Sequence, residues 1–112
     1  MTVNYSNIPN ARKISEYTYA WASKDIPMVM DIAKENNWII LGGDVLTLQG
    51  SYTYDSWYYA PQNNVDITEN VSRSVKQCVD YIQKFETLMG KQYLYSLAIS
   101  NAFVGAKITD MP

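Results

Sequence analysis

The feature that most constrains the fold is one long amphipathic helix predicted between residues 66 and 90. Its apolar positions recur every three or four residues and form a single stripe: Ile67, Val71, Val75, Cys78, Ile82, Phe85 and Met89. Asp66 and Glu69 have the spacing of a D-x-x-E capping signature, and Gly90 ends the pattern. A helix with one apolar stripe has to bury it against another layer, so the rest of the chain must supply that layer.

The stretch before this helix predicts a β-hairpin. Residues 38–48 and 52–60 are rich in the apolar and aromatic residues that favour strands, and Gln49-Gly50 between them fits a two-residue turn. Structural roles are assigned to three glycines, Gly42, Gly43 and Gly50. The first two predict a bulge or the close approach of another backbone, and the third belongs to the turn.

The two-residue turn has a consequence for the charges of the hairpin. It pairs Asp44 directly with Asp55 across the two strands. Two opposed aspartates repel each other. Either the register differs, for example through a bulge at the glycines, or a cationic group relieves the pair.

Three further elements follow from the pattern of the chain. Residues 14–21 place Ile14, Tyr17 and Trp21 at helical spacing, which predicts an amphipathic helix. A second helix is predicted from Asp25-Ile26-Pro27 to Asn36-Asn37, with the aspartate as cap and the proline in the first turn. Residues 93–99 are apolar on both faces of a strand, which is typical of a central strand.

These elements predict one α+β domain over residues 1–112, with residues 1–10 and 102–112 loosely ordered. Its small, mainly antiparallel sheet combines the β-hairpin with the later central strand and carries two or three helices on one face. The opposite face of the sheet then has no helical cover. A functional surface is best sought there.

The composition excludes several kinds of chemistry. The 112 residues contain no histidine and one cysteine, Cys78. This removes histidine-based catalytic triads, most zinc sites and an internal disulfide framework. Cys78 itself lies on the apolar stripe of the long helix, where we expect a small buried hydrophobe. We therefore predict no enzyme activity, no metal and no cofactor.

Charge and hydropathy limit the cellular locations and the kinds of partner that we expect for this protein. No apolar run reaches the length of a membrane span, and residues 1–13 lack the apolar core of a secretory signal. The net charge is −2, whereas nucleic-acid binding depends on an excess of Lys and Arg. We expect a cytoplasmic protein with neither a membrane nor a nucleic-acid partner.

Acidic and aromatic residues are concentrated in the hairpin. No Lys or Arg occurs between Lys34 and Arg73. In the second strand, alternation groups Asp55 with Trp57 and Tyr59, and we expect this set to face outward because it contains the carboxylate. Aromatic anchors beside acidic groups suit contact with a basic protein surface. The candidate partner-binding residues are Asp44, Asp55, Trp57 and Tyr59.

Other interpretations of these residues stay open. The aromatic residues can be the core of a thin domain, or they can form a small-ligand or carbohydrate-binding module by stacking on a ligand. A pair of carboxylates can serve a hydrolase or an oxygen-ligand metal site. An uncovered sheet face can also join two copies into a homodimer.

The hairpin resembles a known family. Its two motifs are Ile40-Leu41-Gly42-Gly43-Asp44-Val45 and Tyr52-Thr53-Tyr54-Asp55-Ser56-Trp57-Tyr58-Tyr59. With the helix and strand that follow, they are similar to the bacterial Immunity protein 40 family of polymorphic toxin systems over residues 38–100. The resemblance implies a small α+β antidote that binds a cognate toxin and blocks it without chemistry of its own. A toxin with a basic surface would suit the acidic hairpin.

Overall fold

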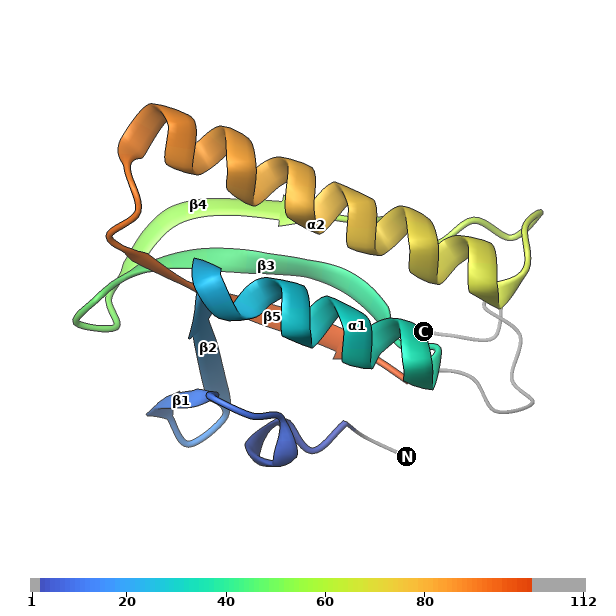
Figure 1. Ribbon diagram of the computed structural model, residues 1–112, viewed down its shortest axis with the longest axis horizontal. Coiled ribbons are helices and arrows are strands. Elements are labelled where there is room, and N and C mark those ends of the chain that lie inside the picture. Colours follow the sequence, from blue (N-terminus) through green and yellow to red (C-terminus); the bar gives the residue numbers. More distant parts are fainter. Residues whose placement is uncertain (1–2, 102–112) are drawn as a thin grey trace.

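The computed structural model describes residues 3–101, which form a sheet and two helices (Figure 1). The strands are β1 (Arg12–Ser15), β2 (Thr18–Ala22), β3 (Ile39–Thr47), β4 (Tyr52–Tyr58) and β5 (Tyr93–Ser100). The helices are α1 (Ile26–Asn36) and α2 (Ile67–Met89), with short 3-10 turns η1 (Tyr5–Asn7) and η2 (Ser23–Asp25). The loose C-terminal end predicted for residues 102–112 lies outside the described residues.

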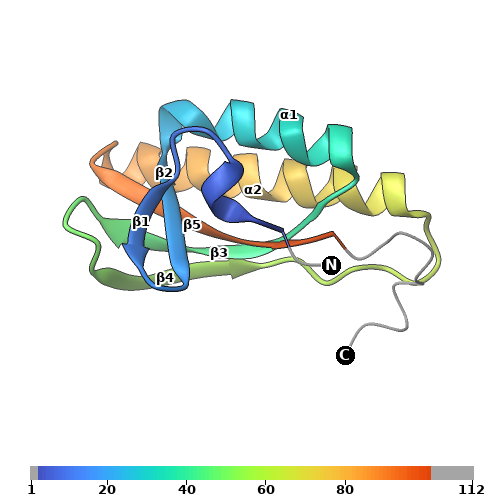
Figure 2. The same cartoon turned by 90° about the horizontal axis from the view of Figure 1, so that it is seen from below.

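The predicted α+β class is confirmed. The five strands in the described part of the chain pair antiparallel in the order β1-β2-β5-β3-β4. Both helices cover the same face of this sheet, as Figure 2 shows from below. The main core lies between the two layers and includes Trp21, Val29, Ile40, Val45, Cys78 and Tyr95, all fully buried. Within residues 3–101 no helix is both long and apolar enough to cross a bilayer.

Helix α2 begins and ends where its sequence signals predict. The Asp66 side chain accepts a hydrogen bond of 2.8 Å from the Glu69 backbone N–H, and Gly90 is the C-cap. The predicted stripe is buried from Val71 to Phe85, but Met89 in the last turn of the helix is 55% exposed. The stripe region also contains the buried Ser74, whose hydroxyl oxygen accepts a hydrogen bond from a backbone N–H of β3.

Strand β5 is the centre of the sheet, as predicted from its apolar faces. It pairs with β2 on one side and β3 on the other. Tyr95 points into the main core, while Leu94 joins a small second cluster with Ala20 and Leu46. Both sides of β5 are therefore buried at this end, which explains why its sequence does not alternate between apolar and polar residues.

The helix predicted over residues 14–21 is wrong. This segment is the β1–β2 hairpin, whose strands meet at Lys13↔Tyr19 and Ser15↔Thr18. Tyr17 lies at the tip and is 84% exposed, so it does not belong to a buried stripe. Three apolar residues at helical spacing were too few to outweigh the β-branched and aromatic residues of Thr18–Ala22, which pack well on a pleated sheet.

The turn between β3 and β4 contains one residue more than predicted. The Gly50 N–H bonds the Thr47 carbonyl at 2.9 Å, and the Thr47 N–H bonds the Ser51 carbonyl at 2.8 Å. Leu48, Gln49 and Gly50 thus form a three-residue loop. Gly50 has a φ of 87°, the left-handed conformation that closes such loops and favours glycine.

The N-terminal segment completes the edge of the sheet beyond β2. Strand β2 pairs only with the first part of β5, at Leu94, Tyr95 and Ser96. Farther along β5, the Ile99 N–H donates a hydrogen bond of 2.8 Å to the Tyr5 hydroxyl oxygen. One backbone N–H on the edge of β5 that β2 does not cover thus bonds to a side chain instead of a strand.

Candidate functional site

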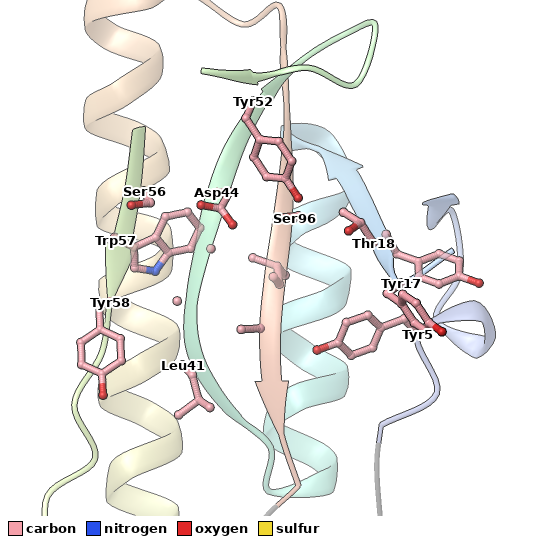
Figure 3. A pocket seen from close by; sticks show the side chains of 15 residues that line it. Tyr5, Tyr17, Thr18, Leu41, Asp44, Tyr52, Ser56, Trp57, Tyr58 and Ser96 are labelled. Carbon is pink, nitrogen blue, oxygen red and sulfur yellow. The ribbon is translucent and has the colours of Figure 1, made fainter. Parts of the chain in front are cut away.

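The face of the sheet opposite the helices forms an open groove of about 620 Å³. One wall contains Tyr5 and Tyr17 from the N-terminal part of the chain, and the other contains Tyr52 and Tyr58 of β4. Figure 3 shows these side chains around the sheet, with Asp44 of β3 between the walls. Three of the four tyrosines are largely solvent-exposed: Tyr17 is 84%, Tyr52 49% and Tyr58 72% exposed.

A row of polar residues crosses the floor of the groove. Asp44 pairs in register with Ser96 of β5 on one side and Ser56 of β4 on the other. Residues that lie directly opposite one another on neighbouring strands point to the same face of the sheet, so these three side chains share one face. Asp44 is half-buried, and within residues 3–101 it is the only charged residue that lines the groove. In the same range it makes no side-chain hydrogen bond or ion pair.

The predicted pairing of Asp44 with Asp55 is wrong, because β4 bulges. Between Asp44↔Ser56 and Leu46↔Tyr52, β4 uses two residues more than β3. The bulge is held by the Thr53 hydroxyl, which donates to the Val45 carbonyl at 3.0 Å and accepts from the Asp55 N–H at 3.2 Å. Its middle residue, Tyr54, has a φ of 72° and is 93% exposed. A second irregularity, against β5, lies between Ile40 and Gly42.

The side chains of β4 divide into the two alternating sets that were predicted. The set with Asp55, Trp57 and Tyr59 was expected to face outward, and this expectation is wrong. Trp57 and Tyr59 are 9% and 6% exposed and belong to the main core under the helices. Asp55 belongs to the same alternating set of β4 as Trp57 and Tyr59, which face the helices. Asp55 is also near Tyr81 of α2, whose pKa is raised first by burial and second by the Asp55 carboxylate. Burying two large aromatic side chains outweighs turning one aspartate toward the helix layer, where it stays exposed at the edge.

Gly42 and Gly43 make room for Trp57. A Cβ atom on Gly43 would collide with the indole ring of Trp57 and the carbonyl oxygen of Ser96. One on Gly42, whose φ is 150°, would collide with the Trp57 carbonyl oxygen. The ring instead packs over Gly43 and stacks on Tyr81, with centroids 4.8 Å apart. Within residues 3–101 its indole N–H has no hydrogen-bond partner.

Tyr59 is fixed by a residue that the sequence did not single out. Its hydroxyl donates a hydrogen bond of 2.7 Å to the side-chain oxygen of the buried Asn70 on α2. The same oxygen accepts from the Gln62 N–H at 2.8 Å, and the Asn70 amide donates to the Gln62 carbonyl at 2.9 Å. Burial raises the pKa of Tyr59. These bonds hold the connection between β4 and α2 against the helix.

The structure therefore places the four predicted site residues in different parts of the molecule. Asp44 lies in the groove, Asp55 lies on the other side of the sheet, and Tyr59 is a core residue. Trp57 is also buried in the core, but it contributes to the lining of the groove. Among the groove residues that sequence reasoning missed are Tyr5, Tyr17, Tyr52, Ser56, Tyr58 and Ser96. The signal for those in β4 was present, because Tyr52, Ser56 and Tyr58 form the alternate set of that strand.

The placement of Cys78 and of the carboxylates bears on the chemical alternatives. Burial raises the pKa of the Cys78 thiol to about 12, and the side chain is fully buried. A buried, protonated thiol is a poor nucleophile. Asp44 and Asp55 do not form a carboxylate pair, because they lie on opposite sides of the sheet. In the described residues no group of three His, Cys, Asp or Glu gathers that could hold a metal ion.

Comparison with known proteins identifies the family. The family model described as Immunity protein 40 matches residues 10–99, which include both hairpins, both helices and nearly all of β5. No curated protein and no solved structure matched the chain. The matched region includes the β3–β4 hairpin and the whole polar row of the groove. The chain therefore belongs to the Immunity protein 40 family.

Proposed function

We propose that this protein binds a cognate toxin domain and blocks it with the uncovered face of its sheet. Membership of the family implies an immunity protein, whose partner is a toxin. The observation that supports the contact surface is the groove itself, which combines exposed tyrosines with a half-buried carboxylate. Tyrosine offers a wide, rigid contact area with a polar tip, which suits a surface that is wet when free and buried when bound.

The charge of the surface suggests the character of the toxin. The β3–β4 hairpin contains Asp44 and Asp55 but no Lys or Arg. An acidic surface speeds encounter with a basic one and excludes acidic competitors. A toxin domain with a basic surface around its active site would fit. The antidote then acts by occupying that surface, and it needs no catalytic residue of its own.

Co-expression tests this proposal. The toxin domain encoded beside this protein's gene is expressed alone, with the wild-type protein, and with the double variant Asp44→Lys, Tyr58→Ala. We expect growth arrest from the toxin, rescue by the wild type, and loss of rescue with the variant. Both substitutions change exposed or half-buried groove side chains, so the variant should fold.

A matched control carries the same kinds of change on the helix layer. Asp31→Lys with Leu88→Ala alters an exposed acid of α1 and an exposed apolar residue of α2, and it should rescue growth like the wild type. A toxic neighbour that the wild type fails to neutralise would contradict the proposed function. Full rescue by a folded groove variant would contradict the contact surface only.

A second candidate function, small-ligand or carbohydrate binding, is favoured by the same tyrosine walls. The groove volume of about 620 Å³ lies within the usual range for ligand sites. Thermal unfolding in the presence of a panel of soluble sugars separates the two candidates. A sugar that raises the melting temperature, with the rise lost in Tyr52→Ala, would support ligand binding, and no rise is expected of a toxin antidote.

A further inference from the structure

We infer that the groove receives one arginine side chain of the toxin, with its guanidinium group on Asp44. This inference rests on the proposed function and names the chemistry of the contact. It is carried by three features of the groove: its lone carboxylate, the hydroxyl groups beside that carboxylate, and the small residues next to the polar row.

The carboxylate requires a cation once the groove is covered. Asp44 is half-buried and, within residues 3–101, has no side-chain hydrogen bond or ion pair and no Lys or Arg among the other groove residues. A partner that covers the groove removes the water around this charge. Stripping a carboxylate of water is strongly unfavourable unless a positive, hydrogen-bonding group replaces it. The partner must therefore bring a cationic side chain to Asp44.

The groups beside Asp44 favour arginine over lysine. Ser96 and Ser56 flank Asp44 in register, at the strand spacing of about 4.8 Å. Carboxylate and hydroxyl oxygens in one row offer several acceptors to the planar fork of a guanidinium group, which has five N–H donors. In Figure 3 the side chain of Tyr52 points toward the middle of the groove. Tyrosine rings add faces on which a guanidinium group stacks.

The floor also has room for the long stem of such a side chain. Next to the polar row, Gly42 pairs with Ala98 of β5 and with Tyr58 of β4. Gly42 has no side chain, and Ala98 adds a single methyl group. The methylene groups of an arginine can lie over these two residues with Tyr58 as a wall, while its head reaches Asp44.

Affinity measurements on paired variants test the charge. The toxin domain encoded beside this protein's gene is titrated with the wild type, Asp44→Asn and Asp55→Asn. Asp55 is the matched control because it lies on the same hairpin but outside the groove. We expect Asp44→Asn to weaken binding by about 30-fold or more, as for a desolvated charge pair, and Asp55→Asn by less than about threefold. Equal effects of the two variants would overturn the inference and leave only general acidity.

Chemical footprinting tests the arginine directly. Phenylglyoxal modifies exposed arginine side chains, and mass spectrometry locates the modified positions on the toxin. We expect one toxin arginine to be protected in the wild-type complex and to become reactive in the complex with Asp44→Asn. If a neutralising complex protects no arginine, or protects the same arginines with both proteins, the inference is wrong and the proposed function stands. If no complex forms with a toxic partner, both fail together.

Discussion

At the scale of single residues, the aromatic side chains differ in whether their polar atoms are exposed or hydrogen-bonded inside the protein. The groove tyrosines Tyr17, Tyr52 and Tyr58 are exposed, whereas the Tyr5 hydroxyl accepts a hydrogen bond from the Ile99 N–H. The buried Tyr59 and Tyr95 donate their hydroxyl groups to Asn70 and Glu86. Trp57 is the exception, since its N–H is buried without a partner in the described residues. Its position depends instead on shape, through the two glycines that leave space for it.

The buried Cys78 leads to a prediction about pH. Burial raises its pKa from 9.0 to about 12, so the unfolded thiol loses its proton first as the pH rises. The folded state is therefore stabilised by this residue below pH 9.0, and that contribution is lost between pH 9.0 and about 12. In Cys78→Ala the free energy of unfolding should fall less steeply in this range, by up to about 1.4 kcal/mol per pH unit.

Urea unfolding of the two proteins at a series of pH values measures this difference. The buried tyrosines share the direction of the shift, but they are present in both proteins and cancel in the comparison. Parallel stability curves would show that the thiol ionises equally in both states. As a control, Cys78 of the folded wild type should not react with a thiol reagent at neutral pH until urea unfolds the protein.

At the scale of elements, the junction between β4 and α2 depends on one side chain. Asn70 bonds Tyr59 and both backbone groups of Gln62. Asn70→Ala leaves the buried Tyr59 hydroxyl and the Gln62 N–H without these partners. We expect the free energy of unfolding to fall by at least about 2 kcal/mol, measured by urea denaturation. Ser72→Ala on the exposed face of the same helix should change it by less than about 0.5 kcal/mol.

A double variant separates the hydrogen bond from the packing. Adding Tyr59→Phe removes the hydroxyl group that Asn70→Ala leaves unpaired, so the two losses should not add. Strict additivity would mean that Tyr59 and Asn70 do not depend on each other.

The elements that the sequence predicted are those with independent local signals. Helix α2 has a cap, a long stripe and a terminal glycine, and the β3–β4 hairpin has strand residues on both sides of a glycine. The β1–β2 hairpin was missed because three apolar residues match a helix by chance. The set of β4 side chains that faces the helices was predicted wrongly because it depends on a bulge. This bulge is held by hydrogen bonds of Thr53, one of them to the neighbouring strand β3.

For the candidate site, the same limit applies to three of the four predicted residues. Asp44 could be placed because it follows two glycines in a strand whose apolar residues mark the core face. Trp57, Tyr59 and Asp55 could not, since a choice between two alternating sets needs the position of the helix layer. The N-terminal wall of the groove depends on tertiary contacts between residues 5 and 99, which no local pattern contains.

At the scale of the whole molecule, the proposed contact surface has to be free in the isolated protein if it is to bind a partner. We therefore expect the isolated protein to be a monomer, with a melting temperature that does not change with protein concentration. Calorimetry over a range of concentrations measures this. A melting temperature that rises with concentration would indicate a homodimer. If the groove variant Asp44→Lys, Tyr58→Ala abolished that rise, the dimer would occupy the same face.

The central position of β5 also affects how the molecule forms during synthesis. Strands β2 and β3 are not paired with each other, because both pair with β5, the last strand of the described chain. Until residues 93–100 leave the ribosome, the sheet consists of two separate hairpins, and α2 has only part of its layer to pack on. A growing chain therefore cannot complete the face that carries the groove. If this face is the contact surface, as proposed above, we expect fragments that stop before β5 to give no protection from the toxin.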